Sequence, residues 1–418
     1  MEYQPKPMKV DWPTLDRRRF VGKAAAGLAL LASAPAAAAA TDSRRARDRA
    51  AQTAVETRLV TQAGALRPTL ADRMKELQVP AVSIAVLEEG RIRWTRAYGA
   101  ADADTGRHAT PETLFQAASM SNAVASAGAL RLVEAGTLAL DEDVTLRLKG
   151  WSPAADAFSA IDKITLRRLL SHTAGLTLSG YPGYGAGGPV PTTVQSLAGI
   201  KPSNTPAVRL FARPGERLAY SGGGYTVAQL LMTEATGESF PDLLERLVLR
   251  PAGMRQSTFD QPLTGRGRGR AASGHGANGR PIQGLSHTYP EYAAAGLWTP
   301  PSDYGRFVIA IQNAWSGQPG ALLTRETART MTTPVLPPYA LGLISGTRGG
   351  RPTIEHGGSN AGFRNDFMAF LDGSRQGAVV MSNGDAGGLL VAQVLGTLAE
   401  AYGWPPRDQL STVPRAPY

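Results

Sequence analysis

Hydrophobic and polar positions near both ends of the chain are arranged as β-strands require. The run AVSIAVL at 81–87, the turn EEG and the run RIRWTRAYG at 91–99 predict a β-hairpin, because apolar and β-branched residues flank a glycine-containing turn. Three later runs have the same character: YALGLIS at 339–345, NDFMAFLD at 365–372 and GAVVMSNG at 377–384. Strands at both ends predict one antiparallel sheet built from the two ends of the chain.

Helical patterns fill the middle of the chain and flank these strands. Residues 56–77 predict an amphipathic helix, since Leu59, Val60, Leu66 and Leu70 can share one face. Further helical runs lie at 119–135, 165–171, 224–237, 240–249 and, at the C-terminal end, 389–403. We expect an α+β fold in which a mainly helical lobe, about 119–300, is inserted in a sheet flanked by helices, with a site in the cleft between the lobes.

The N-terminal segment is typical of an export signal. Arg17, Arg18, Arg19 and Phe20 precede the apolar run VGKAAAGLALLASA and a small-residue tract with an A-x-A site at 38–40. This order predicts a twin-arginine signal peptide over 1–40, with a membrane anchor or a buried helix as the alternative. We expect a linker at 41–55, a single domain at 56–405 and a tail at 406–418, in a periplasmic or secreted protein. No later stretch is apolar for long enough to span a membrane.

Composition excludes several classes of function. With no cysteine among 418 residues, disulfides, thiolate chemistry and cysteine-bound zinc are absent. The net charge of +10 falls to about +7 without the leader, whose six basic residues exceed its three acidic ones by three. A basic surface can attract nucleic acid, anionic lipid or cell-wall polymer, and export argues against nucleic acid. We interpret the run GRGRGR at 265–270 as a solvated loop rather than an RNA-binding fragment.

No metal or cofactor is expected. The five histidines, His108, His172, His275, His287 and His356, show no metal-ligand spacing, and the chain contains neither H-E-x-x-H nor a phosphate-binding G-x-x-x-x-G-K-[ST] loop.

The stretch FQAASMSN places Ser119 where a helix is predicted to begin. Residue 122 then lies one turn further on the same face, within reach of the serine oxygen. The amide of Ser119 at the start of the helix can also stabilise an oxyanion. This geometry suits a nucleophile and its base, but the residue at the base position is Asn122. Taken alone, the pattern is better explained by Ser119 capping the helix, because serine is a favoured capping residue.

Two later stretches complete a recognisable order. AYSGGGYTV carries Tyr220 before a glycine turn, and TIEHGGSNAGF carries His356 followed by Gly357, Gly358 and Ser359. With Ser119, they resemble the S-x-x-K, Y-x-N and H-x-G signatures of the serine β-lactamase and penicillin-binding-protein-like family. The resemblance is to the branch of class C β-lactamases, D-alanyl-D-alanine carboxypeptidases, D-aminopeptidases and family VIII esterases. It extends from about 56 to 403 through LVEAGTLALDEDV (132–144), ITLRRLLSHTAGL (164–176), RPGERLAYSGGGY (213–225) and AAGLWTPPSDYGRFV (294–308).

The resemblance implies a role for each matching residue. Ser119 would attack a carbonyl, Tyr220 would exchange protons with it, and the amides of Ser119 and Ser359 would form the oxyanion hole. Substrate would lie along His356, Gly357, Gly358 and Gly222, while His172 would order the loop after its helix. The implied function is an exported serine hydrolase that forms an acyl-enzyme with an ester or amide substrate. That substrate would be a small molecule or a peptide, β-lactam-like or derived from the cell wall.

Two residues depart from the family pattern. Gly222 replaces an asparagine amide that faces substrate, which leaves room for esters or other amides. Asn122 replaces the lysine, and an amide can neither accept the serine proton nor supply a positive charge to Tyr220. Loss of a general base costs on the order of 10²–10⁴ in rate. The lysines beyond the leader, Lys75, Lys149, Lys163 and Lys201, lie outside the three signatures. Two hypotheses follow: a slowed hydrolase, or an inactive family member that binds a cell-wall peptide or a partner.

Overall fold

The computed structural model describes residues 34–61, 67–153 and 162–408. Most of the predicted signal peptide, 1–33, and most of the predicted tail, 409–418, lie outside these ranges. The chain divides into two compact units, residues 1–47 and 48–418. Helix α1 (Ala34–Thr57) runs through 41–55, where we expected a linker. The segment is rich in alanine and arginine, which favour a helix, and its Ala51 and Val55 are buried.

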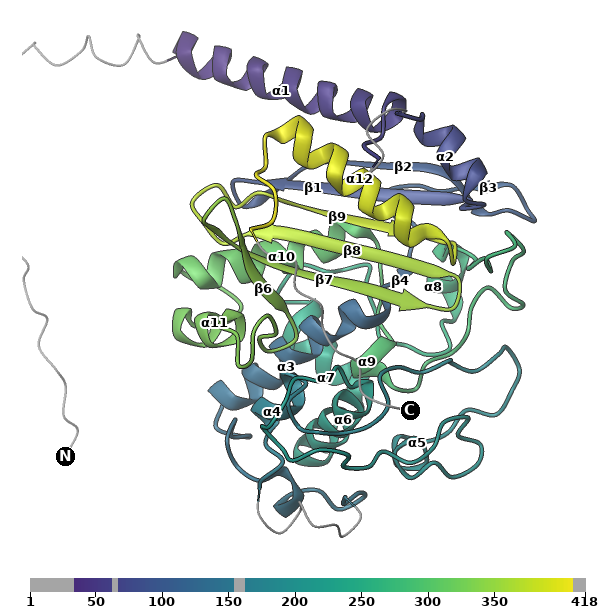
Figure 1. The fold of residues 1–418 in the computed structure, drawn as a ribbon, viewed down its shortest axis with the longest axis vertical. Helices are drawn as coiled ribbons and strands as arrows, with labels where there is room; N and C mark the ends of the chain where they lie inside the picture. Colours follow the sequence, from purple (N-terminus) through teal and green to yellow (C-terminus); the bar gives the residue numbers. More distant parts are fainter. Residues whose placement is uncertain (1–33, 62–66, 154–161, 409–418) are drawn as a thin grey trace, which may run out of the picture. The chain divides into compact units, whose positions relative to one another are not determined.

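The predicted fold class is confirmed by a seven-stranded antiparallel sheet in the order β3-β2-β1-β9-β8-β7-β6 (Figure 1). Its strands are β1 (Ala81–Glu88), β2 (Arg91–Asp102), β3 (Arg107–His108), β6 (Ile344–Arg348), β7 (Arg351–Asn360), β8 (Phe363–Phe370) and β9 (Gly377–Ser382). The N-terminal and C-terminal strands meet at the centre, where β1 pairs with β9 from Val82 opposite Ser382 to Leu87 opposite Gly377.

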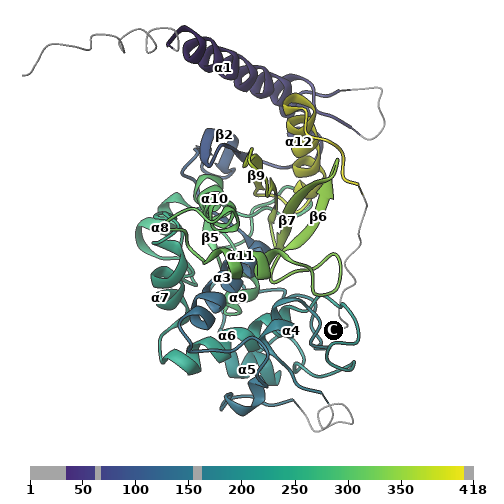
Figure 2. The same cartoon turned by 90° about the vertical axis from the view of Figure 1, so that its left-hand side faces the viewer.

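Helices cover both faces of this sheet. Helix α12 (Gly387–Tyr402) lies on the face where Val82, Ile84 and Val86 of β1 join a buried apolar cluster (Figure 1). Helix α10 (Pro301–Ser316) packs on the other face, against Ala85 and Leu87 (Figure 2). Every residue of β1 is therefore buried, which explains why its sequence, AVSIAVLE, is mostly apolar rather than alternating.

The inserted lobe is mainly helical, as predicted. It begins and ends at a second, two-stranded sheet in which β4 (Phe115–Gln116) pairs with β5 (Trp298–Thr299). Between them lie η1 (Ala118–Met120), α3 (Ser121–Glu134), η2 (Val144–Leu146), α4 (Leu166–Leu170), α5 (Thr193–Ala198), α6 (Gly222–Thr236), α7 (Phe240–Leu244), η3 (Glu245–Leu249), α8 (Gly265–Arg270) and α9 (Tyr292–Ala295). The run GRGRGR is thus a short helix rather than a loop, although none of its residues is buried.

Two other predicted elements differ from the structure. The helix expected at 56–77 is interrupted, because α1 ends at Thr57 and α2 (Leu70–Glu76) begins only after Pro68, with Thr69 as its N-cap. Proline favours an extended residue before it and so separates the two helices. The strand expected at 339–345 begins at Ile344, because Gly342 adopts φ +77° just before it. Helix α11 (Arg325–Thr332) precedes this segment.

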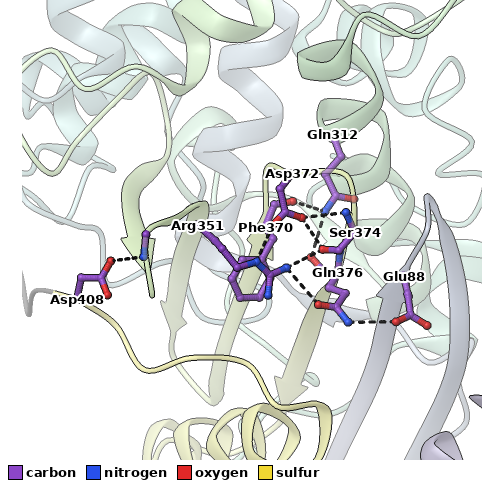
Figure 3. Close-up of polar contacts among 9 residues, drawn as sticks. Glu88, Gln312, Arg351, Phe370, Asp372, Ser374, Gln376 and Asp408 are labelled. Carbon is purple, nitrogen blue, oxygen red and sulfur yellow. Dashed lines mark hydrogen bonds and ion pairs between the residues drawn. The ribbon is translucent and has the colours of Figure 1, made fainter.

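A polar network fixes the end of β7 that is remote from Ser359 (Figure 3). The Arg351 guanidinium lies 3.7 Å from the centre of the Phe370 ring and donates to Asp372 at 2.6 Å. Gln312 of α10 donates to the carbonyl of Phe370 at 2.9 Å, so the β8–β9 turn is held to a helix as well as to a strand. At this end of the sheet, strand, turn and helix are therefore joined by side-chain hydrogen bonds.

None of the helices within the described ranges is both long and apolar enough to cross a bilayer.

Candidate active site

Helix α3 starts at Ser121 rather than at Ser119, so Ser119 lies in the short 3₁₀ turn η1 that precedes the helix. Its side chain is half-buried. The preceding residue, Ala118, has φ +53°, a left-handed conformation that is costly for a residue with a side chain. The alternative that Ser119 caps the helix is wrong. Met120 occupies the N-cap position of α3, and no side chain forms a capping hydrogen bond there.

The Asn122 side chain is fully buried and joins the two halves of the site. An amide is oriented by its partners. The orientation that satisfies both ends directs Nδ2 to the carbonyls of Ser119, Ala293 and Ala294 at 3.2, 3.2 and 3.1 Å. Oδ1 then accepts a hydrogen bond from the Tyr220 hydroxyl, with 2.9 Å between the two oxygens. Asn122 therefore brings the backbone of Ser119 and the phenol of Tyr220 together, and it holds the phenol as a donor.

Tyr220 is positioned by the start of helix α6 and by a histidine. Ser221 caps α6, with its hydroxyl accepting from Gly224 N at 2.9 Å. His172 Nδ1 accepts from Ser221 N at 3.0 Å, and the His172 ring lies 4.0 Å from the Tyr220 ring. Burial lowers the pKa of His172 well below its ordinary value, so its ring is neutral. His172 thus orders the turn that presents Tyr220, whereas the role expected for it was in the loop after its own helix.

His356 lies 6.2 Å from Tyr220 between ring centres, but its imidazole is buried. The carbonyl of Gly357 can only accept, so His356 Nδ1 carries the proton and donates to it at 2.6 Å. His356 Nε2 therefore accepts from the hydroxyl of Tyr339. Burial lowers the pKa of His356 to about 4. Both ring nitrogens are engaged, so any effect of His356 on substrate in this state acts through its neighbours.

Strand β7 presents one edge to the turn that carries Ser119. Within the described residues, β6 pairs with β7 only from Arg351 to Glu355. The edge beyond Glu355 faces η1, where a Cβ at Gly358 would lie 2.1 Å from the carbonyl oxygen of Ala117. Gly357 and Ser359 alternate with Gly358 and are exposed. The predicted role of Ser359 in an oxyanion hole stays a prediction, and the adjacency of β7 to η1 is the contact on which it depends.

Several residues that hold the site together were missed in the sequence. Asn360 Nδ2 donates to Gln116 Oε1 at 2.9 Å, and Asn365 Nδ2 donates to the Gln116 carbonyl at 2.7 Å. These bonds fasten β7 and β8 to β4, three residues before Ser119. Tyr339 was also missed, because it lies in a loop that we had assigned to a strand. A tyrosine at the start of an apolar stretch, as in YALGLIS, was the only available signal.

Gly222 lies at the first position of α6, where a Cβ would meet Cε2 of Tyr181 at 3.3 Å. The Tyr181 hydroxyl forms a 2.8 Å hydrogen bond with Thr226 Oγ1 one turn along the helix. The ring of Tyr181 therefore occupies space beside Gly222 that a side chain there would share. The assignment of Gly222 to substrate binding stays a prediction.

The described residues contain no cluster of three or more side chains that could hold a metal ion. The groups gathered here are a serine hydroxyl, a phenol and backbone amides, which are the kinds of group that acyl transfer uses.

The β-lactamase family model matches residues 66–398, and the chain belongs to this family. The predicted resemblance is thereby confirmed. The chain is 33% identical to Esterase EstB of Burkholderia gladioli over 198 residues, which are 43% of this chain and 47% of the esterase. It is 25% identical to Protein flp of Staphylococcus aureus (strain N315) over 237 residues, 54% of this chain and 42% of that protein. The matches therefore span less than half the length of these curated relatives.

Solved structures share the fold at lower identity. The octameric penicillin-binding protein homologue from Pyrococcus abyssi superposes with a TM-score of 0.66 at 21% identity, covering 80% of this chain and 76% of that chain. A β-lactamase/D-alanine carboxypeptidase from Yersinia pestis, complexed with citrate, superposes with a TM-score of 0.61 at 17% identity, covering 80% and 97%. At these identities the likeness establishes the fold alone.

Proposed function

We propose that this chain is an exported serine hydrolase of the β-lactamase family, which transfers the acyl group of an ester or amide to Ser119. The observation that carries the proposal is the amide of Asn122, which contacts both the Ser119 carbonyl and the Tyr220 hydroxyl. Segments almost 100 residues apart in sequence thereby meet around one serine. The strained Ala118 beside it supports a functional role, since such strain is concentrated at active sites.

In the proposed reaction, Ser119 Oγ forms a bond to the substrate carbonyl carbon, and its proton passes to the Tyr220 oxygen as the Tyr220 proton passes to the leaving group. The bond from the carbonyl carbon to the leaving group breaks, and water then releases the acyl group by the same proton exchange in reverse. Because Tyr220 already donates to Asn122 Oδ1, it is a poor proton acceptor in the resting state. We therefore expect slow acylation, and we expect esters with good leaving groups to be hydrolysed faster than amides.

Labelling and turnover test this proposal. The purified protein is incubated with a fluorophosphonate probe and, separately, with a short-chain p-nitrophenyl ester. We expect a covalent adduct on Ser119 by mass spectrometry and slow ester hydrolysis, and both should disappear in Ser119→Ala. An adduct on another residue, or hydrolysis unchanged in Ser119→Ala, would refute the role of Ser119.

The second candidate is an inactive member that binds a cell-wall peptide or partner in the same site. The buried Asn122 favours it, because the position of the usual base holds an amide. Saturable binding of peptidoglycan fragments, with neither adduct nor turnover, would select this function.

Export is a separate part of the proposal and rests on the twin-arginine pattern at residues 17–20. Fractionation of cells that express the full chain tests it. Replacing Arg17 and Arg18 by lysine together should retain the protein in the cytoplasm, whereas release of the double variant in the usual amount would exclude this route.

A further inference from the structure

Glu291 is a fully buried carboxyl group with an incomplete set of partners. Its Oε1 accepts from the hydroxyl of Ser196 at 2.8 Å, while Oε2 is buried and has no hydrogen-bond partner among the described residues. An ionised carboxylate needs more donors than this, because burial of an incompletely paired charge is costly. The protonated form is therefore the one that fits the site.

The position of Glu291 links two segments around the candidate active site. Ser196 lies on α5, and Glu291 immediately precedes α9. The carbonyl of Glu291 accepts from Ala294 N and Ala295 N at 3.1 and 2.9 Å. The turn so formed supplies the Ala293 and Ala294 carbonyls that face Asn122 Nδ2. A chain of contacts therefore runs from Ser196 through Glu291 and α9 to Asn122 and Tyr220.

Gln229 of α6 fixes the same junction independently of charge. Its Nε2 donates to Thr193 Oγ1 and to the Pro290 carbonyl, each at 3.0 Å, and its Oε1 accepts from Ala293 N at 3.0 Å. Two polar side chains therefore join α5 and α9: Gln229, which cannot titrate, and Glu291, which can.

We propose that Glu291 is a positioning residue whose protonated carboxyl ties helix α5 to the α9 turn that holds Asn122. When Glu291 ionises, the cost of burying its charge outweighs the Ser196 hydrogen bond to the carboxylate, and the contact between α5 and α9 loosens. Asn122 then holds Tyr220 less firmly, so the catalytic consequence rests on the proposed function. The structural consequence does not depend on it.

The groups around Glu291 make it the one that titrates. Burial raises its pKa from 4.5 to about 7, against the opposing effects of Ser196 and its own amide. Tyr181 and Tyr184 approach from the segment before α5, and Tyr289 and Tyr292 from its own segment; in each case burial, with the charge of Glu291, raises the phenol pKa above 10. These phenols stay neutral up to about pH 9. Ionisation of Glu291 therefore falls within the range of ordinary assays.

The sign of the effect on stability follows from the two pKa values. Between 4.5 in the unfolded chain and about 7 in the folded chain, the folded state binds more protons. Stability from this group is therefore complete below pH 4.5 and is lost as pH rises through 7, and the unfolding constant rises up to about tenfold per pH unit. His356, whose pKa is lowered to about 4, acts in the opposite direction below pH 6.5, so a comparison with a variant is needed.

Unfolding of the full chain from pH 4 to 9 is measured for the natural protein and for Glu291→Gln, which keeps the shape of the side chain without its charge. Because His356 is common to both, the ratio of their unfolding constants isolates Glu291. We expect this ratio to rise by up to about tenfold per unit between pH 4.5 and 7 and then to level off. A ratio independent of pH would overturn the proposal.

Ser196→Ala provides a second test that does not require Glu291→Gln to fold. Removing the hydroxyl takes away a bond that favours the carboxylate, so the midpoint near pH 7 should move upward. A midpoint that is unchanged or moves downward would contradict the link.

A local readout locates the effect. Hydrogen exchange of peptides from α5 and α9, corrected for the intrinsic rate, should be faster at pH 9 than at pH 6 in the natural protein but not in Glu291→Gln. Ester turnover relative to Glu291→Gln should fall above pH 7. Absence of all turnover would count against the proposed function alone, because exchange and unfolding need no substrate. Equal exchange at both pH values would overturn the link itself.

Discussion

Asn122 is surrounded by three backbone carbonyls and one phenol, and this setting determines what a lysine would do there. An ammonium group has three donors and a positive charge, so it would satisfy the carbonyls and lower the pKa of Tyr220. The amide offers two N–H donors to the same carbonyls and supplies no charge. The hydrogen-bonding geometry is thus retained while the electrostatic contribution is lost.

We predict that Asn122→Lys raises kcat/KM for a p-nitrophenyl ester by on the order of 10²–10⁴-fold, the usual contribution of a general base. Asn122→Gln is the matched control, because it lengthens the side chain without adding charge and should not raise turnover. Steady-state kinetics of the three proteins measure the effect. Equal rates in the lysine and glutamine variants would mean that a missing base is not what limits the site.

Tyr339 provides a prediction about stability rather than rate. In Tyr339→Phe, the buried Nε2 of His356 loses its donor, and an unsatisfied buried polar atom costs about 1–3 kcal/mol. Denaturant unfolding at pH 7 should show this loss. Tyr292→Phe is the comparison, since the Tyr292 hydroxyl has no hydrogen bond within the described part of the chain and its removal should change the free energy of unfolding by less than about 0.5 kcal/mol. Equal effects would argue against the Tyr339–His356 bond.

At the scale of elements, the contact between β7 and η1 brings the sheet to the serine. We predict that Gly358→Ala separates them, because the new Cβ would lie 2.1 Å from the Ala117 carbonyl oxygen. Such overpacking costs about 1–3 kcal/mol of stability. Labelling of Ser119 by a fluorophosphonate should fall with it.

Gly357→Ala is the control on the same strand. Its Cβ would meet only the Asn365 carbonyl oxygen, at an ordinary 3.6 Å. The free energy of unfolding of this variant should match that of the natural protein within error. If the two alanine variants behaved alike, the close approach of β7 to η1 would not be what positions the site.

Most elements were predictable where one physical signal dominated. The hairpin of β1 and β2 was found because its apolar runs flank a glycine turn, and β8 and β9 were found within two residues at each end. The strand β7 was not, because its run RPTIEHGGSN has two glycines and no regular alternation. Its pairing partners β6 and β8, rather than local propensity, make it a strand.

The site was predictable only as far as its motifs reach. Ser119, Asn122, Tyr220 and His356 were found as candidates because each stands in a short signature. The partners of these residues were not, since Tyr339, Gln116 and Glu291 are brought near them by the fold from distant segments. The burial of His356 could not be predicted from the sequence either, because it depends on Tyr339, whose hydroxyl contacts His356 Nε2.

At the scale of the whole molecule, the second unit begins within α1, and this predicts where the chain can be shortened. Asp48 accepts from Tyr402 at 2.7 Å and pairs with Arg93 at 2.8 Å, while Ala51 and Val55 are fully buried. For a chain that starts at residue 58, the free energy of unfolding should fall by about 3 kcal/mol or more, because the buried apolar surface of α1 and the contacts of the Asp48 carboxylate are lost.

A chain that starts at residue 41 is the matched control. It removes the predicted signal peptide but keeps residues 48–57, so its unfolding free energy should equal that of the full chain. Thermal and denaturant unfolding of the three chains decide the matter. Equal stability of the chains starting at 41 and 58 would show that the last turns of α1 contribute nothing.

Because β1 pairs with β9, β1 is synthesised long before its partner strand. About 290 residues separate the end of β1 from the start of β9, so at roughly 5–20 residues per second the ribosome needs about 15–60 s to supply the missing neighbour. During that interval the apolar edge of the first hairpin has no native partner. In the nascent chain, a chaperone or the chain's own helices must therefore cover this edge until β9 has emerged from the ribosome.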